Sequence, residues 1–322
     1  MKAIVNHTYG PPDQLRFEHI DTPVPGDDQV LVRIEAAGIN RGDWHATTGL
    51  PYIVRAAELG IRRPTIAIRG TDLAGTVTAV GRDVHGFRTG DAVFGWADGT
   101  LAEQAVTTPD RLATRPSRMS ATQAAAMPTA GVTALQAVRD RAAVRAGQRV
   151  LITGASGGVG SFAVQIARAF GAEVTGVAST RNVELVRSLG ATDVIDYTTR
   201  DVVHGPERYD AVIDAAGSHG PSAWRRVLQP TGTLVLVGGP QGRWVGGTLR
   251  FAAAIALSRL VTQQLLPLFS TPRSADLADL AELAASGRVT PVLDRTYALT
   301  EAVDAIRHIG AGHTRGKLVV TV

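Results

Sequence analysis

The first part of the chain consists of short runs rich in apolar and β-branched residues, separated by glycine and proline. The runs lie at residues 2–7, 29–39, 72–81, 91–97 and 102–108. Runs of this kind, bounded by turn-forming residues, are typical of β-strands. They predict a small, irregular and mostly antiparallel β-domain that extends to about Arg118.

After Pro116 the pattern changes to apolar runs that alternate with helical segments. An alanine-rich helix is predicted from about Ala121, a second helix ends near Ala169, and a third spans Val183–Leu189. The strands predicted in this region are residues 149–155, 173–179, 193–197, 210–217 and 233–239. Apolar strands that alternate with helices indicate a parallel sheet covered on both faces, which is a doubly wound α/β domain.

The last segment returns to mixed structure. Helices are predicted near Ser274–Ala285 and Thr300–Ile309, followed by a closing strand at the end of the chain. A length of 322 residues corresponds to about two domains. We therefore predict a β-rich domain at residues 1–120, a parallel α/β domain at residues 121–267, and a return of residues 268–322 to the first domain.

Thr248–Phe269 is the most apolar stretch of the chain, and Arg250 and Arg259 interrupt it. Its uninterrupted apolar runs are far shorter than the roughly 20 residues that cross a bilayer. We predict a buried or interface helix here and no membrane span. The first residues also lack the long apolar core of a secretory signal, so a cytoplasmic location is expected.

The composition narrows the chemistry that the chain can perform. It contains no cysteine, which excludes disulfides, thiolate zinc ligands, iron–sulfur clusters and cysteine nucleophiles. The 33 basic residues barely outnumber the 29 acidic ones, and the net charge is +4. Because the basic residues are scattered and form no stripe with interleaved aromatic residues, we do not expect nucleic-acid binding.

A glycine-rich turn follows the first predicted strand of the α/β domain and precedes a helix. It begins at Gly154 and continues with Ala155, Ser156, Gly157, Gly158, Val159 and Gly160. This is the dinucleotide-binding pattern, in which Ala155 stands at the position of the first glycine and Gly157 and Gly160 are the second and third glycines. The glycine at 157 lets the backbone approach a pyrophosphate, and the one at 160 lets helix and strand pack closely. An ordinary glycine-rich turn is the alternative, but strand, turn, helix and next strand have the spacing of a βαβ unit.

The residues after the second strand of that unit predict which nicotinamide cofactor binds. NAD-dependent proteins place an acid there for the ribose hydroxyl. Here the residues are Ser179, Thr180 and Arg181, and no acid lies between Glu173 and Glu184. Hydroxyls and a guanidinium suit the 2′-phosphate of NADPH, because arginine forms charge-assisted bonds with phosphate. A solvated loop arginine is the alternative interpretation.

Short motifs lie in four segments of the chain, at residues 38–43, 80–93, 147–168 and 316–317. In this order they resemble the signatures of the medium-chain dehydrogenase/reductases, and in particular of the quinone oxidoreductase branch that includes zeta-crystallin. The resemblance implies a GroES-like β-rich catalytic domain joined to a Rossmann cofactor domain. It also implies an enzyme that uses NADPH to reduce quinones or α,β-unsaturated carbonyls.

The zinc enzymes of that superfamily have a cysteine where this chain has Asn40, and a His-Glu pair where it has Thr71 and Asp72 after Gly70. Asparagine and threonine are poor zinc ligands. The sequence therefore predicts no metal site. Without a Lewis acid, the resemblance favours conjugate hydride transfer over oxidation of simple alcohols.

The resemblance also implies roles for single residues. Asn40 is expected beside the nicotinamide or the substrate carbonyl, with a plain turn residue as the alternative. Asp43 is expected in the same site or as a helix cap. Tyr52 is expected either to donate a hydrogen bond to the substrate oxygen or to line the site as a loop aromatic. Further cofactor contacts are implied at Thr133, Tyr197, Ala215, Val237, Gly238 and Lys317.

Two other functions are compatible with the sequence. An enoyl-thioester reductase shares the fold, and Arg55, Arg62 and Arg63 could supply a positive rim for its carrier protein. The second is a protein that binds NADPH but catalyses no reaction. We also expect a homodimer, joined through the sheet edge near Thr233–Gly238 and assisted by Thr248–Phe269.

Overall fold

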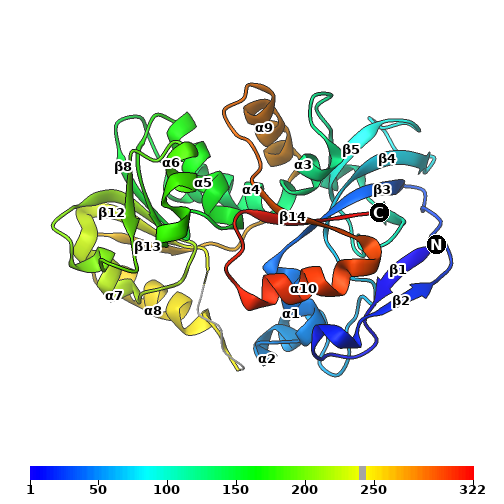
Figure 1. Ribbon diagram of the computed structural model, residues 1–322, viewed down its shortest axis with the longest axis horizontal. Coiled ribbons are helices and arrows are strands. Elements are labelled where there is room, and N and C mark those ends of the chain that lie inside the picture. The colour runs from blue at the N-terminus through cyan, green and yellow to red at the C-terminus, as the bar shows by residue number, and fades with distance from the viewer. Residues whose placement is uncertain (239–243) are drawn as a thin grey trace. The chain divides into compact units, whose positions relative to one another are not determined.

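The computed structural model describes residues 1–238 and 244–322, except for the side chains of residues 57 and 58. The chain divides into two compact units (Figure 1). The first unit contains Met1–Val132, Pro272–Gly287 and Pro291–Val322, and the second contains Thr133–Thr271 and Arg288–Thr290. The division falls within helix α4 (Pro128–Leu135), so the alanine-rich helix before α4 lies with the first unit.

The first unit is built on a mostly antiparallel sheet with the strand order β14-β15-β3-β4-β5-β7, in which β6 also pairs with β3. β1 (Lys2–Val5) and β2 (Arg16–His19) form a separate antiparallel pair. The strands of the main sheet are β3 (Val30–Ile39), β4 (Asp72–Val80), β5 (Ala92–Trp96), β6 (Gln104–Thr107), β7 (Leu112–Thr114), β14 (Leu293–Ala298) and β15 (Lys317–Thr321). The predicted β-domain is confirmed, but β2, β7 and β14 were not predicted.

Helices pack against this sheet closely enough to require glycine. A Cβ atom on Gly38 in β3 would lie 2.1 Å from the carbonyl oxygen of Ala125, so only glycine lets the alanine-rich helix approach the strand. Leu73 and Leu318, from β4 and β15, are fully buried in the same core. The helices of this unit are α1 (Arg41–Thr48), α2 (Tyr52–Val54), α3 (Ala121–Ala125), α9 (Ser274–Ala285) and α10 (Ala302–Ala311).

The second unit is a parallel sheet with the strand order β10-β9-β8-β11-β12-β13. Its helices are α5 (Gly158–Ala169), α6 (Val183–Ser188), α7 (Pro221–Trp224) and α8 (Thr248–Ser258). Its strands are β8 (Arg149–Thr153), β9 (Glu173–Ala178), β10 (Asp193–Asp196), β11 (Tyr209–Asp214), β12 (Leu228–Leu236) and β13 (Gln264–Pro267). The strand order reverses between β8 and β11, and open α/β sheets bind ligands beyond the carboxyl ends of the strands at such a reversal.

Two buried glutamines hold the chain where it leaves and re-enters the second unit. The Gln136 amide donates to the Thr271 carbonyl at 2.7 Å and accepts from the Thr271 N–H at 3.1 Å. The Gln165 amide makes the same two bonds with Thr290, at 3.0 and 2.8 Å. Each side-chain amide therefore bonds both the C=O and the N–H group of a single residue, as a neighbouring β-strand would.

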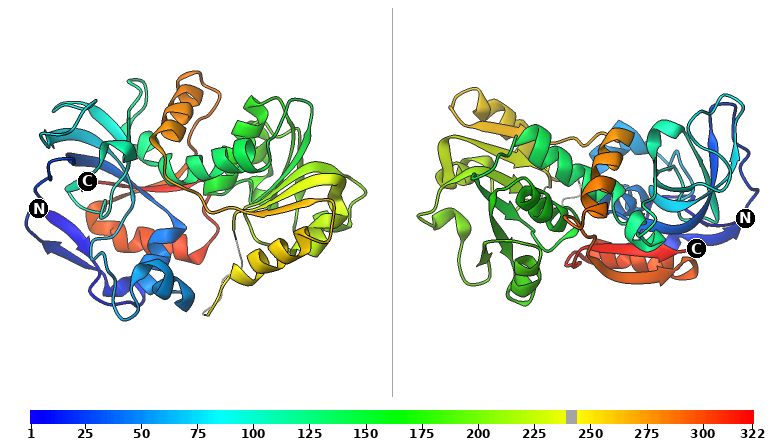
Figure 2. Two further views of the ribbon diagram at one scale, coloured as in Figure 1. Left: turned by 180° about the vertical axis from the view of Figure 1, so that it is seen from behind. Right: turned by 90° about the horizontal axis from the view of Figure 1, so that it is seen from above.

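The prediction of one continuous helix over Thr248–Phe269 is wrong, and so is its burial, whereas its part in an interface stays a prediction. α8 ends at Ser258, most of its residues are exposed, and the rest of the stretch forms β13, in which Leu265 is buried. Figure 2 shows α8, in yellow, beside the edge of the sheet that β13 forms. No helix in the described part of the chain is long and apolar enough to cross a membrane. The cytoplasmic location stays a prediction.

The predicted dimer edge at Thr233–Gly238 must also be corrected. Most of that segment belongs to β12, which pairs with β11 on one side and with β13 on the other. β13 covers the N–H and C=O groups that β12 would otherwise leave open. β13 therefore forms this edge of the sheet, and β12 lies inside it.

Candidate active site

Four charged side chains of the first unit are almost completely buried around the start of α1. They are Asp43, Arg69, Asp72 and Lys317, each 4% exposed or less. Charges removed from water are tolerated only when opposite charges and hydrogen bonds replace the solvent. Three of these residues, Asp43, Asp72 and Lys317, form hydrogen bonds with Asn40, which is itself 8% exposed.

Lys317 orients the side-chain amide of Asn40. The Lys317 ammonium donates to the Ile39 carbonyl at 2.8 Å and also to Asn40 Oδ1. An ammonium can only donate, so the oxygen of the Asn40 amide faces Lys317 and the NH₂ group must point the other way. Asn40 Nδ2 lies 3.4 Å from Thr71 Oγ1, and Thr71 is exposed. The NH₂ group therefore faces the Thr71 hydroxyl and the Asp72 carboxyl group, whose pKa a hydrogen bond from Asn40 lowers.

Asp72 anchors the group to α4. Its carboxylate accepts from the Thr129 N–H at 3.1 Å and from the Thr129 hydroxyl at 2.5 Å, and it lies 3.8 Å from the Lys317 ammonium. Trp96 Nε1 donates to the same hydroxyl at 3.2 Å. Sequence reasoning considered Asp72 only in connection with a possible zinc site. Thr71 and Asp72 stand where the zinc enzymes have a His-Glu pair, and this correspondence could have indicated that Asp72 lies in the site.

The structure shows Asp43 as a helix cap, and its role in the active site stays a prediction. Its carboxylate accepts from the Asn40 N–H at 2.7 Å, so it caps the start of α1 from the third helical residue while lying inside the charged group. Burial raises the pKa of Asp43 to about 7, and the nearby Asp72 adds to the effect. Burial likewise raises the pKa of Asp72 and lowers those of Lys317 and Arg69. Protonation in this group is therefore accessible near neutral pH.

Tyr52 lies at the start of α2, in contact with Arg55. The Arg55 guanidinium lies 4.8 Å from the centre of the Tyr52 ring and 4.3 Å from that of Tyr9. Arg55 also donates to the Gly49 carbonyl at 2.8 Å, which holds the turn between α1 and α2. These contacts give the Tyr52 ring a packing role, and its role as a donor to substrate stays a proposal.

The donor atoms around Asn40 are poorly suited to a metal ion. Within the described residues, no three His, Cys, Asp or Glu side chains gather closely enough to hold one. The Asn40 amide oxygen already accepts from the Lys317 ammonium, which also faces Asp72. A cation of the chain itself therefore occupies the acceptors that a metal would need.

In the second unit, the glycine-rich turn lies between β8 and α5. A Cβ on Gly160 would come within 2.0 Å of the Gly154 carbonyl oxygen, and Gly154 has a φ of +59°, so glycine is needed at both positions. Gly157 is the N-cap of α5 and carries no side chain that could bond the first amides of the helix. Those amides remain available to an anion, and the helix dipole favours one. The turn therefore fits the pyrophosphate of a dinucleotide.

The residues expected to bind a 2′-phosphate follow β9, where Ser179 is half-buried and Thr180 and Arg181 are exposed. The structure adds a carboxylate to them. Asp196, the last residue of β10, accepts from the Thr180 hydroxyl at 2.6 Å. Hydrogen bonds from Thr180 and Thr198 hold the pKa of Asp196 below its usual value, so this carboxylate is charged at neutral pH.

Sequence reasoning missed Asp196 because it searched for an acid only along the chain between residues 173 and 184. In the parallel sheet Asp196 lies directly opposite Ala178, the residue before Ser179. The signal was present as the aspartate that ends the third predicted strand. Parallel strands end at the same edge of a sheet, so the ends of neighbouring strands should have been read together.

The remaining predicted cofactor residues lie at the carboxyl ends of other strands of this unit. Tyr197 follows β10 and is 56% exposed, and Ala215 follows β11. Val237 and Gly238 follow β12, and their N–H groups donate to the Asp214 carbonyl at 3.1 and 3.2 Å. A Cβ on Gly238 would lie 2.3 Å from the Ala215 carbonyl oxygen, so these two strand ends approach each other closely. Thr133, in α4, is the first residue of the second unit.

A GroES-like β-rich unit and a doubly wound parallel unit with a glycine-rich turn define the class of medium-chain dehydrogenase/reductases, and the predicted fold is confirmed. Family models support both halves. The model of the alcohol dehydrogenase GroES-like domain matches residues 26–117, and that of the zinc-binding dehydrogenase matches residues 189–320.

Similarity to individual proteins identifies the family within this class. The chloroplast envelope quinone oxidoreductase homolog of Arabidopsis thaliana is 34% identical over 338 residues, which cover 99% of this chain and 98% of that protein. The 2-methylene-furan-3-one reductase of Solanum lycopersicum is 32% identical over 337 residues, covering 99% of this chain and 79% of that protein. The solved quinone oxidoreductase of Coxiella burnetii has a TM-score of 0.87 and 31% identity, over 100% of this chain and 99% of that one. The chain belongs to the quinone oxidoreductase family of medium-chain dehydrogenase/reductases, which confirms the resemblance seen in the sequence.

The pKa of Asp43 yields a prediction for stability. Because its pKa in the folded protein, about 7, lies above the ordinary value of 3.8, the folded state binds this proton more tightly than the unfolded chain. The free energy of unfolding of the parent should therefore fall, relative to that of Asp43→Asn, as the pH rises from about 4 to 7, and the difference should be constant at higher pH. Urea unfolding at a series of pH values measures it.

Asp28→Asn is the control for this experiment, because Asp28 is exposed. It should follow the parent at every pH. A difference between the parent and Asp43→Asn that does not change with pH contradicts the prediction.

Proposed function

We propose that this oxidoreductase transfers hydride from NADPH to quinones or α,β-unsaturated carbonyls, without a metal ion. The observation that carries the proposal is the Asn40 amide, which Lys317 holds by its oxygen so that its NH₂ group faces the exposed residue Thr71. The quinone and enone reductases among the relatives support the substrate class.

The residues that would hold the cofactor line the carboxyl edge of the second sheet. The turn at 154–160 and the N-terminus of α5 suit the pyrophosphate, and the ends of β9 and β10 suit the adenosine ribose. The ends of β11 and β12 are then left for the nicotinamide half. The dihydronicotinamide ring of a bound cofactor supplies the hydride.

On the chain's side, the chemistry requires a donor for the substrate oxygen. When hydride adds to the β-carbon of an enone, negative charge develops on the carbonyl oxygen, and a quinone oxygen gains charge in the same way. A preorganised N–H group stabilises that charge without having to reorient. Asn40 Nδ2 is such a group, because Lys317 holds the other end of the amide. Solvent or Tyr52 delivers the final proton.

The same arrangement supports the proposal of reduction without a metal ion. A Lewis acid polarises a carbonyl through its positive charge. Here the buried Lys317 ammonium acts through the Asn40 amide, since it withdraws electron density from Oδ1 and strengthens the N–H groups as donors. Lys317 is thus a positioning and polarising residue, and Asn40 is the group that touches substrate.

The function is tested by turnover of chelator-treated protein. We expect NADPH oxidation with a benzoquinone and with an alkyl enone, and little with a simple ketone. Asn40→Asp still accepts from Lys317 but has no NH₂ group, so kcat/KM should fall by about 10² to 10³, the usual effect of losing one oxyanion donor. Activity that disappears with chelation and returns with zinc would overturn the metal-free proposal.

Other outcomes of this assay separate the alternative functions. A strong preference for enoyl thioesters favours the carrier-dependent reductase, and cofactor binding without turnover favours an idle binding protein. Glu103→Gln is the control variant and should keep parental turnover. Glu103 is half-buried and accepts a hydrogen bond from the Lys2 N–H. Parental turnover in Asn40→Asp contradicts the role of Asn40.

Cofactor choice depends on two opposed charges at the ends of β9 and β10. We propose that Arg181 favours the 2′-phosphate of NADPH, whereas the Asp196 carboxylate repels it. Arg181→Met should therefore lower the ratio of kcat/KM with NADPH to that with NADH, by roughly ten- to a hundredfold, the usual effect of losing a bond to a charged group. Asp196→Asn should raise the same ratio. Steady-state kinetics with both cofactors measures it, and equal use of the two by the parent contradicts the NADPH preference.

We further propose that the protein is a homodimer joined through β13 and α8. β13 is an edge strand, and Leu249, Ile255, Leu260 and Phe269 expose between 49% and 82% of their surface close to it in the chain. Exposed apolar side chains near an edge strand invite association. Light scattering at micromolar concentration should give about twice the chain mass of 33.8 kDa. Ile255→Glu combined with Leu260→Glu should yield a monomer, and a parent that is monomeric contradicts the proposal.

A further inference from the structure

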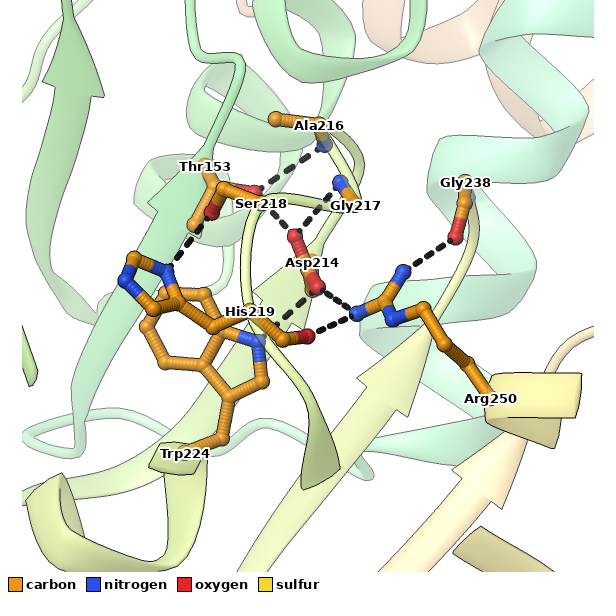
Figure 3. Close-up of polar contacts among 9 residues, drawn as sticks. All are labelled: Thr153, Asp214, Ala216, Gly217, Ser218, His219, Trp224, Gly238 and Arg250. Atoms are coloured by element: carbon orange, nitrogen blue, oxygen red, sulfur yellow. Dashed lines mark hydrogen bonds and ion pairs between the residues drawn. The ribbon is translucent and has the colours of Figure 1, made fainter. Parts of the chain in front are cut away.

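The second unit buries one carboxylate completely at the carboxyl edge of its sheet. Asp214, the last residue of β11, is 0% exposed, and both of its oxygens are used (Figure 3). Oδ1 accepts from the Thr153 hydroxyl at 2.7 Å and the Gly217 N–H at 2.9 Å. Oδ2 accepts from Trp224 Nε1 at 2.9 Å and from the Arg250 guanidinium. These donors come from β8, from the loop after β11, from α7 and from α8.

Arg250 contributes more than a charge to this arrangement. One of its terminal nitrogens, Nη2, donates to the Asp214 carboxylate and to the His219 carbonyl, and the other, Nη1, donates to the Gly238 carbonyl at 3.0 Å. The guanidinium therefore joins the loop after β11 to the end of β12, as Figure 3 shows. The planar fork of arginine can span these three acceptors, whereas a lysine ammonium is a single point.

Gly238 is held from both sides as a result. Its N–H donates to the Asp214 carbonyl at 3.2 Å, and its carbonyl accepts from Arg250. Since a Cβ at this position would lie 2.3 Å from the Ala215 carbonyl oxygen, the peptide of Gly238 lies directly against the residue that follows β11. Arg250 thereby determines the orientation of a peptide group at the sheet edge where cofactors bind.

The strand order assigns this edge to one half of the cofactor. β8, β9 and β10 lie on one side of the reversal, and β11, β12 and β13 lie on the other. In a doubly wound sheet each side binds one mononucleotide. The residues suited to the adenosine ribose follow β9 and β10, so the ends of β11 and β12 face the nicotinamide mononucleotide.

We propose that Arg250 is a positioning residue for the nicotinamide half of the cofactor. By joining Asp214, the His219 carbonyl and the Gly238 carbonyl, its guanidinium holds the ends of β11 and β12 in the arrangement that the nicotinamide mononucleotide meets. Arg250 touches neither cofactor nor substrate in this proposal, and it acts through the backbone of Gly238. The inference rests on the proposed use of a nicotinamide cofactor, but not on the identity of the reduced substrate.

A purely structural role makes a different prediction from a positioning role. Arg250→Lys keeps a positive charge beside the buried Asp214, so it avoids the large cost of an unpaired buried carboxylate. It cannot reach three acceptors in different directions. If Arg250 serves only as an ion-pair partner of Asp214, Arg250→Lys should behave like the parent. If Arg250 positions Gly238, Arg250→Lys should lose that effect. Arg250→Met removes both functions, and Asp214 then still accepts from Thr153, Gly217 and Trp224.

The test compares the binding of NADPH with that of a fragment, adenosine 2′,5′-bisphosphate, which is the adenosine half of the cofactor without the nicotinamide mononucleotide. Fluorescence or calorimetric titration measures both dissociation constants, and thermal unfolding shows whether each variant is folded. For Arg250→Lys we expect a parental unfolding midpoint, about tenfold weaker binding of NADPH, and binding of the fragment within about twofold of the parent. Arg226→Lys, at an exposed arginine of the same unit, should match the parent in all three measurements.

Two results would overturn the proposal. One is parental binding of NADPH by Arg250→Lys, which would reduce Arg250 to a counter-ion. The other is an equal loss for NADPH and for the fragment, which would indicate a general disturbance of the unit. A parent that binds neither NADPH nor NADH disproves the proposed function itself, whereas a parent that binds cofactor but reduces no acceptor leaves this test intact.

Discussion

Charge buried at the end of each sheet is the constraint on which both candidate sites depend. A buried ammonium must be surrounded by acceptors and a buried carboxylate by donors, because neither can be left without partners away from water. In the first unit Lys317 satisfies this requirement partly with Asn40, which leaves the amide with a single orientation. In the second unit Asp214 satisfies it partly with Arg250, which joins two strand ends. In both cases, pairing a buried charge also orients a neutral group at the proposed site.

The two units contribute different kinds of chemistry. The second unit offers mostly backbone: the amides at the start of α5, the turn that only glycine can form, and the peptide of Gly238. The first unit offers side chains, among which Asp43 titrates near neutral pH because it is buried beside Asp72. At one position where zinc enzymes of the superfamily carry a metal ligand, this chain has the Asn40 amide, which accepts a hydrogen bond from the Lys317 ammonium. In the proposed function, the charge that polarises the substrate thus comes from the chain itself.

Local pattern was a good guide to the strands and helices with strong signals and a poor guide elsewhere. β3, β8, β9 and α5 were predicted because each has a long apolar run or a glycine-rich turn at a fixed spacing. The apolar stretch Thr248–Phe269 was misjudged, because a short apolar run is equally compatible with a buried helix and a buried strand. That error also misplaced the sheet edge, since β13 comes from the same stretch and covers β12. The short strand β7 was missed because its pattern is weak.

The sequence by itself determined the fold class and the glycine-rich turn, because both depend on the spacing of neighbouring residues and on backbone geometry that only glycine allows. Only the tertiary structure decided which side chains meet. Thr180 and Asp196 are 16 residues apart, Asp214 and Arg250 are 36 apart, and Asn40 and Lys317 are 277 apart. Such pairs are set by strand register and by the need to neutralise buried charge. Neither leaves a mark in the local pattern, because each partner taken alone looks like an ordinary polar residue at the end of an element.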